Sequence, residues 1–208
     1  MNETSQITPE RIGQMYDYLE SRGIPVDIWN GKNNTKTVED LLVEIGEGEA
    51  IMTESHEGYP LKKLFVAVGD VYHGKYQLFE EAQVFDKDGK ISRRFPQFGA
   101  IAEKAKAGED IVESVIRGLG EELGLSIGLS QVSPNVERIV EERVSRAYPG
   151  LRCEYNIGRV RVDLTEDQYR PNNGFLKLED GTEIPYAYTE EQPGKKTTYF
   201  GWRKIVQD

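Results

Sequence analysis

Residues 103–125 read EKAKAGEDIVESVIRGLGEELGL, and the rest of the chain is organised around this stretch. Apolar residues recur in it at helical spacing, at Val112, Val115, Ile116, Leu119 and Leu123. Because a helix turns by about 100° per residue, this stripe faces a core while the carboxylates occupy neighbouring faces. Gly124 supplies a C-terminal stop. The stretch therefore predicts an amphipathic helix that presents clustered anionic oxygens to a divalent cation.

The acidic face has two interpretations. A surface helix commonly carries solvated carboxylates and binds nothing through them. Two glycines favour a ligand instead, because Gly118 and Gly120 lie inside the predicted helix, where each costs about 1 kcal/mol relative to alanine. They leave the backbone bare beside Glu121 and Glu122, where a ligand would approach. Gly118 is therefore a candidate binding position.

The same stretch resembles a Nudix box. That motif runs glycine, five residues, glutamate, seven residues, Arg-Glu, an apolar residue, any residue, Glu-Glu, any residue, glycine and an apolar residue. The positions that fall in register are Glu109, Arg117, Leu119, Glu121, Glu122, Gly124 and Leu125. Two positions depart from the motif, since Glu103 replaces the opening glycine and Gly118 replaces the glutamate after the arginine.

The resemblance implies a hydrolase, dependent on magnesium or manganese, of a nucleoside diphosphate linked to another group. Glu121 and Glu122 match the family's metal-binding pair, and hard oxygen ligands suit these cations. Arg117 matches the arginine that orients the carboxylates. Glu109 matches the first glutamate of the box and is expected to brace the loop through Arg117 or backbone amides. Arg117, Glu121 and Glu122 are thus the catalytic candidates.

Gly118 cannot supply the carboxylate that activates water or binds a further metal in many Nudix hydrolases. A base from outside the box would replace it, and the candidates are Glu166, Asp167, Glu179, Glu190 and Glu191, with Asp163 as an alternative metal ligand. The second hypothesis is a Nudix-fold protein that has lost hydrolysis and binds a nucleotide or a protein partner. Gly118, Gly120 and the missing opening glycine motivate this alternative.

The segment before the box admits two registers. In Nudix proteins a Pro-Gly-Gly-like turn comes just before the box, and a backbone carbonyl there can help to hold the metal. Pro96 with Gly99-Ala100 fits that turn if three extra residues precede Glu109. The ungapped register instead puts Glu103 at the glycine position. A bulky side chain fits poorly at a tight turn, so the insertion is favoured and Gly99 becomes a binding candidate.

Composition narrows the class of protein. The single cysteine, Cys153, excludes an intramolecular disulfide and a thiolate zinc cluster. A net charge of −10 opposes general affinity for nucleic acid. No apolar run reaches the roughly 20 residues of a membrane helix, and the N-terminus lacks a secretory pattern. We expect a cytoplasmic protein with a small-molecule substrate and no membrane partner, and a homodimer stays open.

The flanking segments complete the expected architecture. Apolar residues at helical spacing, each set preceded by a capping residue, predict helices from Pro9 to Gly23 and from Val38 to Ile45. Residues 1–58 are therefore expected to form a helical appendage packed on a domain of residues 59–208. Further patterns predict a helix near 133–147 and strands at 64–68, 76–85, 153–164 and 197–202. This order predicts an α/β (α+β) protein, a Nudix-like α/β/α sandwich with a mixed sheet.

Overall fold

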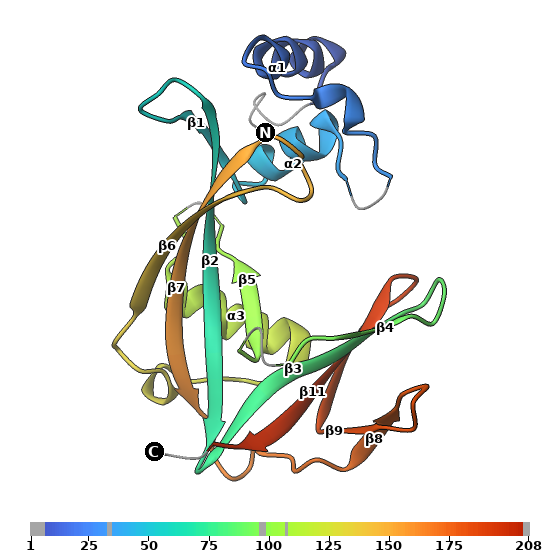
Figure 1. Ribbon diagram of the computed structural model, residues 1–208. Coiled ribbons are helices and arrows are strands. Elements are labelled where there is room, and N and C mark those ends of the chain that lie inside the picture. Colours follow the sequence, from blue (N-terminus) through green and yellow to red (C-terminus); the bar gives the residue numbers. More distant parts are fainter. Residues whose placement is uncertain (1–6, 33–34, 96–98, 107, 206–208) are drawn as a thin grey trace. The chain divides into compact units, whose positions relative to one another are not determined.

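The computed structural model describes residues 7–32, 35–95, 99–106 and 108–205 (Figure 1). Its α-helices are α1 (Pro9–Ser21), α2 (Val38–Gly46) and α3 (Ile111–Leu123). Its strands are β1 (Ile51–Glu54), β2 (Pro60–His73), β3 (Tyr76–Phe85), β4 (Ile91–Arg93), β5 (Ile101–Lys104), β6 (Glu137–Val144), β7 (Arg152–Asp163), β8 (Gly174–Lys177), β9 (Glu183–Tyr186), β10 (Tyr188–Gln192) and β11 (Lys196–Lys204). The predicted α+β class is confirmed.

Contacts divide the chain into two compact units. The first takes in the described residues up to Val66 together with Lys104–Glu109 and Arg138–Ile157. The second comprises Ala67–Glu103, Asp110–Glu137 and the described residues from Gly158 onward. The described part of the predicted appendage, residues 1–58, therefore shares its unit with segments from later in the chain.

The large sheet has the hydrogen-bonding order β10-β11-β3-β2-β7-β6, and β1 and β5 pair with β2 while β4 pairs with β3. The pairs of β11 with β3 and of β10 with β11 are antiparallel. Strands β2 and β7 are instead joined by the ion pairs Lys63–Glu154 and Asp70–Arg159. Residue numbers rise along both strands from the first pair to the second, as they do in a parallel pair. The sheet is therefore mixed, as predicted.

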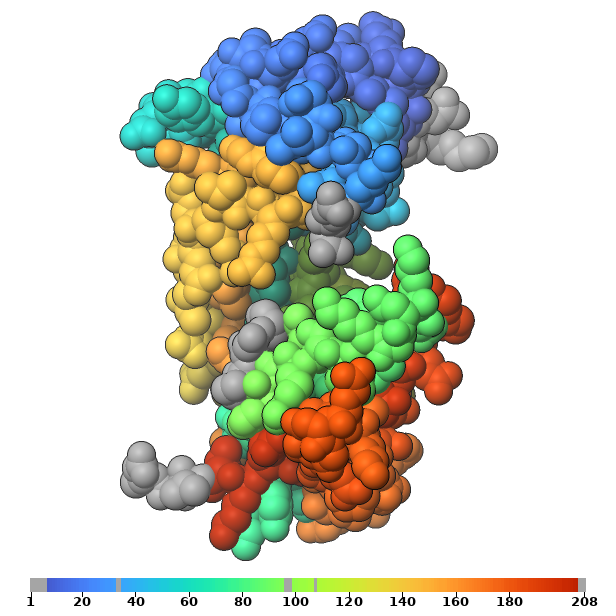
Figure 2. Space-filling model, turned by 45° about the vertical axis from the view of Figure 1, so that its right-hand side comes forward, coloured from blue at the N-terminus to red at the C-terminus, as the bar shows by residue number. Residues whose placement is uncertain are grey.

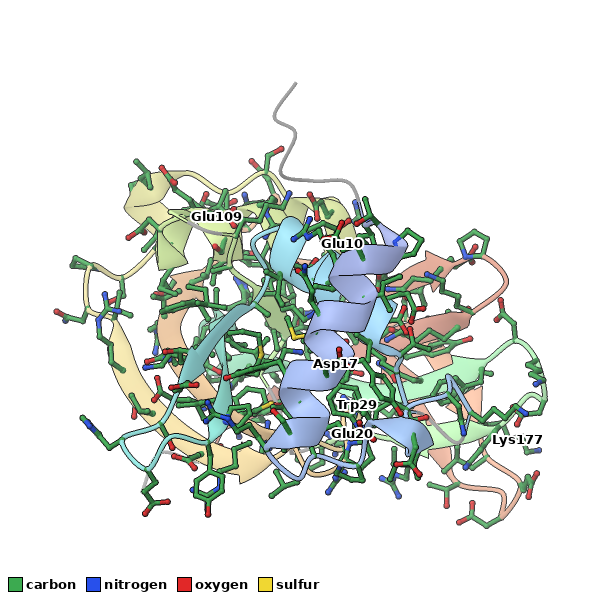
Figure 3. The ribbon with its side chains drawn as sticks, turned by 90° about the horizontal axis from the view of Figure 1, so that it is seen from above. Glu10, Asp17, Glu20, Trp29, Glu109 and Lys177 are labelled. Carbon is green, nitrogen blue, oxygen red and sulfur yellow. The ribbon has the colours of Figure 1, made fainter. Side chains whose placement is uncertain are left out.

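The helices of the first unit begin at side chains that cap them. Thr8 accepts the backbone N–H of Arg11 at the start of α1, and Thr37 forms a capping box with Asp40 on α2. Figure 3 looks onto α1, where the exposed side chains of Glu10, Asp17 and Glu20 follow the helix. Its other face belongs to a core built from Leu19, Ile24, Val26, Trp29, Val38, Leu41, Leu42, Tyr148 and Leu151. The apolar stripe read from the sequence is thus a buried face.

Helix α2 of the same unit carries a buried carboxylate. Glu44 is only 5% exposed, and Lys36 and Lys62 both bind its carboxylate, with the Lys36 Nζ–Oε1 distance at 2.5 Å. Lys104 Nζ lies 3.5 Å from the same Oε1. Burial opposes the charged form, but the hydrogen bonds from Lys36 and Lys62 outweigh it and lower the pKa of Glu44 to about 2.

This carboxylate predicts a loss of stability in acid. The pKa of Glu44 is depressed in the folded state, so its contribution is complete above the unfolded value of about 4.3 and is lost as pH falls through about 2. The loss should be on the order of 3 kcal/mol. Urea unfolding of the wild type and Glu44→Gln between pH 6 and 2 measures it. The difference in free energy of unfolding between the two proteins should shrink as the pH falls toward 2. A difference that stays constant with pH would contradict the assignment.

The second unit holds α3 and most of the antiparallel sheet. Figure 2 shows its C-terminal strands, in orange and red, against the green β3–β4 segment. A β-bulge between Tyr199 and Phe200 shifts the register of β11 on β3. In the part of the chain that the structure describes, no helix is long and apolar enough to cross a bilayer.

The helix predicted near 133–147 is wrong, because Glu137–Val144 forms strand β6. Seven of its eight residues are exposed and Ile139 is half-buried, so its apolar spacing does not record a buried face. Val140 and Val144 are β-branched, which favours an extended backbone. Periodicity indicates a helix only where one face packs against a core.

Candidate functional site

Helix α3 is positioned by its two ends and by its buried stripe. The Asp110 carboxylate accepts the backbone N–H of Val112 at 2.8 Å, and Gly124 ends the helix in the left-handed conformation at φ 65°. Val115 and Leu119 are fully buried. The predicted amphipathic helix is confirmed, and Figure 1 shows it lying beside β5.

Strand β5 places Glu103 directly against this helix. A Cβ atom at Gly118 would lie 2.5 Å from Cγ of Glu103 and 3.0 Å from Cδ1 of Ile101. Only glycine fits at position 118 while Glu103 lies as it does. The two positions that depart from the Nudix motif are therefore in contact with each other.

Arg117 joins the strand to the helix. Its Nη1 atom lies 3.3 Å from Oε2 of Glu103 and 3.1 Å from Oε2 of Glu121. The Glu121 side chain is 62% exposed, whereas those of Arg117 and Glu103 are 22% and 25% exposed. Arg117 thus holds one carboxylate of β5 and one of α3, and Glu121 faces solvent.

Glu122 points elsewhere, because neighbouring helix residues diverge by about 100°. It lines a pocket of about 220 Å³. The polar side chains of that pocket come from α3, β5 and the face of β3, β10 and β11, and are those of Glu80, Gln83, Glu103, Glu122, Glu190, Gln192, Lys196 and Thr198. Glu122 therefore lines this pocket together with Glu103, whereas Glu121 does not line it.

Three adjacent strands build one wall of the pocket. Glu190 of β10 is paired with Thr198 of β11, and Thr198 is paired with Gln83 of β3. Alternate residues of a strand share a face, so Lys196 and Phe200 line the same wall as Thr198. Thr198 is 2% exposed, and its hydroxyl has no hydrogen-bond partner among the described residues. A buried hydroxyl of this kind favours a ligand that offers it a partner.

Carboxyl groups crowd at this pocket. Burial, a hydrogen bond with Glu103 and the nearby carboxylates of Glu190 and Glu80 raise the pKa of Glu122 to about 9. Glu80 has a cationic partner, since Arg94 Nε lies 3.1 Å from its Oε1. A cation bound beside a carboxyl reverses this electrostatic balance and favours its deprotonated form.

The donor set suits a hard divalent cation. Carboxylates from four separate elements face the pocket, namely Glu80 of β3, Glu103 of β5, Glu122 of α3 and Glu190 of β10. Oxygen ligands of this kind select Mg²⁺ or Mn²⁺. As the side chains lie, no three His, Cys, Asp or Glu residues of the described chain already form a group that would hold an ion.

Two further predicted residues lie at other places. The Glu109 carboxylate accepts the backbone N–H of Lys106 at 2.9 Å, within the loop that precedes α3. Gly99 packs on β2, where a Cβ would lie 2.6 Å from Oδ1 of Asp70 and 2.9 Å from the carbonyl oxygen of Gly69. Gly99 does not line the pocket. Pro96, its expected partner in a metal-binding turn, lies outside the described residues.

Of the six carboxylates predicted as base or alternative ligand, Glu190 alone lines the pocket. Its neighbour Glu191 is exposed, as strand alternation requires. Asp163 is bound by Arg161 at 2.7 Å, and Glu166 lies 3.4 Å from Nε2 of His73.

Of the eight polar residues of this pocket, sequence reasoning missed six as functional positions, among them Glu80, Glu103 and Thr198. Glu103 was noticed only as a misfit in the motif, and nothing in the sequence distinguishes Glu80 or Thr198 from other strand residues. Their positions depend on strand pairing, which residue spacing does not reveal.

Comparisons with known proteins identify no family. No family model matches the chain, and no curated protein matches it. Among solved structures, it is similar to the T. brucei MERS1 protein in its apo form, with 13% identity over 82% of this chain and 74% of that chain and a TM-score of 0.29. A likeness this distant carries no conclusion about function.

Proposed function

We propose that the pocket lined by Glu80, Glu103, Glu122 and Glu190 binds Mg²⁺ or Mn²⁺ and that the protein is a Nudix-type hydrolase. The observation that carries this proposal is the convergence of carboxylates from four elements on one pocket. The proposed substrate class, a nucleoside diphosphate linked to another group, rests on the resemblance of residues 103–125 to a Nudix box. A cytoplasmic location and a small-molecule partner belong to the same proposal.

The pocket residues suit the demands of diphosphate cleavage. That reaction needs charge neutralisation, an oriented water molecule and a base, and a bound divalent cation would supply the first of these. Glu122 and Glu103 would hold the ion, with Arg117 fixing Glu103 through the 3.3 Å contact. Glu190, paired with Thr198 on the opposite wall, would take the proton from water as the general base.

Glu190→Gln is expected to lower kcat by about 100-fold or more with little change in KM, because a general base contributes roughly 10²–10⁴-fold. Hydrolysis is measured by chromatography of the products, with a panel of nucleoside diphosphate derivatives and Mg²⁺ or Mn²⁺. Glu191→Gln is the matched control, since it removes a neighbouring carboxylate that is exposed on β10. Equal rates for the two variants would rule out Glu190 as the base.

Gly118 supports one alternative, a Nudix-fold protein that binds a nucleotide or a protein partner without hydrolysis. In that case no member of the substrate panel would be cleaved with either metal. A nucleotide that binds the folded state would still raise the melting temperature. Turnover that depends on added metal would exclude this alternative.

A further inference from the structure

We propose that Glu103 of β5 supplies the carboxylate that α3 lacks at Gly118, so that strand and helix have exchanged a functional side chain. The inference rests on the proposed function, because it assigns Glu103 a role in the same cation site. Glu103 and Gly118 are the two positions that depart from the Nudix motif. Along the sequence they look like independent losses, whereas this exchange makes them one linked change.

The side chain of Glu103 overlaps the space that a side chain at position 118 would need. A Cβ at Gly118 would lie 2.5 Å from Cγ of Glu103 and 3.5 Å from its carboxyl carbon Cδ. A glutamate at position 118 would carry its own carboxyl carbon two bonds beyond that Cβ. The carboxyl group of Glu103 therefore occupies space that a glutamate at position 118 could reach, and the two side chains exclude each other.

The second support is the set of partners that Glu103 has there. Arg117 Nη1 lies 3.3 Å from its Oε2, and its carboxyl group lines the same pocket as that of Glu122. Two carboxyl groups that meet in this way offer oxygen ligands to one divalent cation. Glu103 thus has both an orienting cation and a second acidic side chain beside it.

The third support is independent of the acidic residues. Thr198 lines the same pocket and is 2% exposed, yet its hydroxyl has no hydrogen-bond partner among the described residues. Buried hydroxyl groups are normally satisfied, so this one indicates that the pocket takes a ligand carrying a polar group. The pocket beside Glu103 is therefore more than a patch of surface charge.

Calorimetric titration of Mn²⁺ into the full chain tests the role of Glu103. Glu103→Gln should weaken Mn²⁺ binding by at least about tenfold, a loss typical of side chains that build a metal site. Glu113→Gln is the matched control, because it neutralises an exposed carboxylate of α3 that does not line the pocket, and it should bind as the wild type does. Wild-type affinity in Glu103→Gln would overturn the proposal.

The reciprocal exchange gives the sharper test. Glu103→Gly should lose Mn²⁺ affinity as Glu103→Gln does. The double variant Glu103→Gly with Gly118→Glu should recover Mn²⁺ affinity to within about threefold of the wild type, since a carboxylate returns to the same space. Thermal unfolding shows that each variant is folded. A folded double variant that binds Mn²⁺ as weakly as Glu103→Gly alone would overturn the exchange.

Gly118→Ala tests the steric exclusion between position 118 and Glu103 with the smallest side chain that carries a Cβ. In the wild type it should lower both the melting temperature and Mn²⁺ affinity, because its Cβ displaces Glu103. In the Glu103→Gly background it should lower the melting temperature by less, since only the 3.0 Å contact with Cδ1 of Ile101 remains and alanine is the better helix former. The same effect in both backgrounds would overturn the steric argument.

Failure of this inference can be told apart from failure of the proposed function. Mn²⁺ binding that requires Glu103, without hydrolysis of any nucleoside diphosphate derivative, would support the exchange and contradict the function. Hydrolysis and Mn²⁺ binding that are both unchanged in Glu103→Gln would overturn the exchange and leave the function standing.

Discussion

Glu122→Gln is expected to reduce hydrolysis by at least about 100-fold. Glu122 is the α3 carboxylate that lines the pocket together with Glu103. Loss of an outer partner of a metal ligand costs roughly 10–100-fold, so loss of a direct ligand should cost more. Product chromatography with Mg²⁺ measures the rate.

The same variant should fold at least as stably as the wild type. Burial and neighbouring carboxylates raise the pKa of Glu122 to about 9, so its charged form is disfavoured in the folded protein. A neutral amide of the same shape avoids that penalty. Urea unfolding checks this point, with Glu113→Gln as a control that makes the same substitution at an exposed position of α3. An unstable but active variant would assign Glu122 a structural role.

Arg203→Leu is expected to destabilise the chain by about 3–5 kcal/mol, the largest stability effect predicted for the second unit. Glu81 is 1% exposed, and its two carboxylate oxygens accept hydrogen bonds from Arg203 Nε and Nη2 at 2.6 and 2.7 Å. The guanidinium also lies 4.1 Å from the ring centroid of Phe95. Removing the arginine leaves a buried carboxylate without its cation. Urea unfolding at neutral pH measures the loss.

The double variant Glu81→Leu with Arg203→Leu is the matched control. It removes both charges, and apolar replacements of a buried ion pair are often neutral. It should therefore recover most of the stability that Arg203→Leu loses. A loss of less than about 1 kcal/mol in Arg203→Leu would show that solvent already screens this pair.

The helices were predictable because their signals are local. Thr8 starts one apolar stripe, Thr35 or Thr37 starts a second, and Gly124 follows the end of a third. The structure caps α1 at Thr8, α2 at Thr37 and α3 at Gly124. Strand β6 was missed for the opposite reason. Its residues are mostly exposed, so their apolar spacing reflects no packed face.

The site was less accessible to sequence reasoning. Glu122 and Glu190 were candidates, and both line the pocket. Glu121 does not line it and lies 3.1 Å from Arg117 Nη1, so its role as a metal ligand stays a prediction. Glu103 looked like a defect, because spacing along the chain cannot show that its side chain lies over Gly118.

The most direct test of the cation site is an anomalous difference map from a crystal soaked in Mn²⁺. We predict a peak inside the pocket, within coordination distance of the carboxylates of Glu103 and Glu122. No peak in that pocket, or a peak held only by the exposed carboxylate of Glu121, would contradict it.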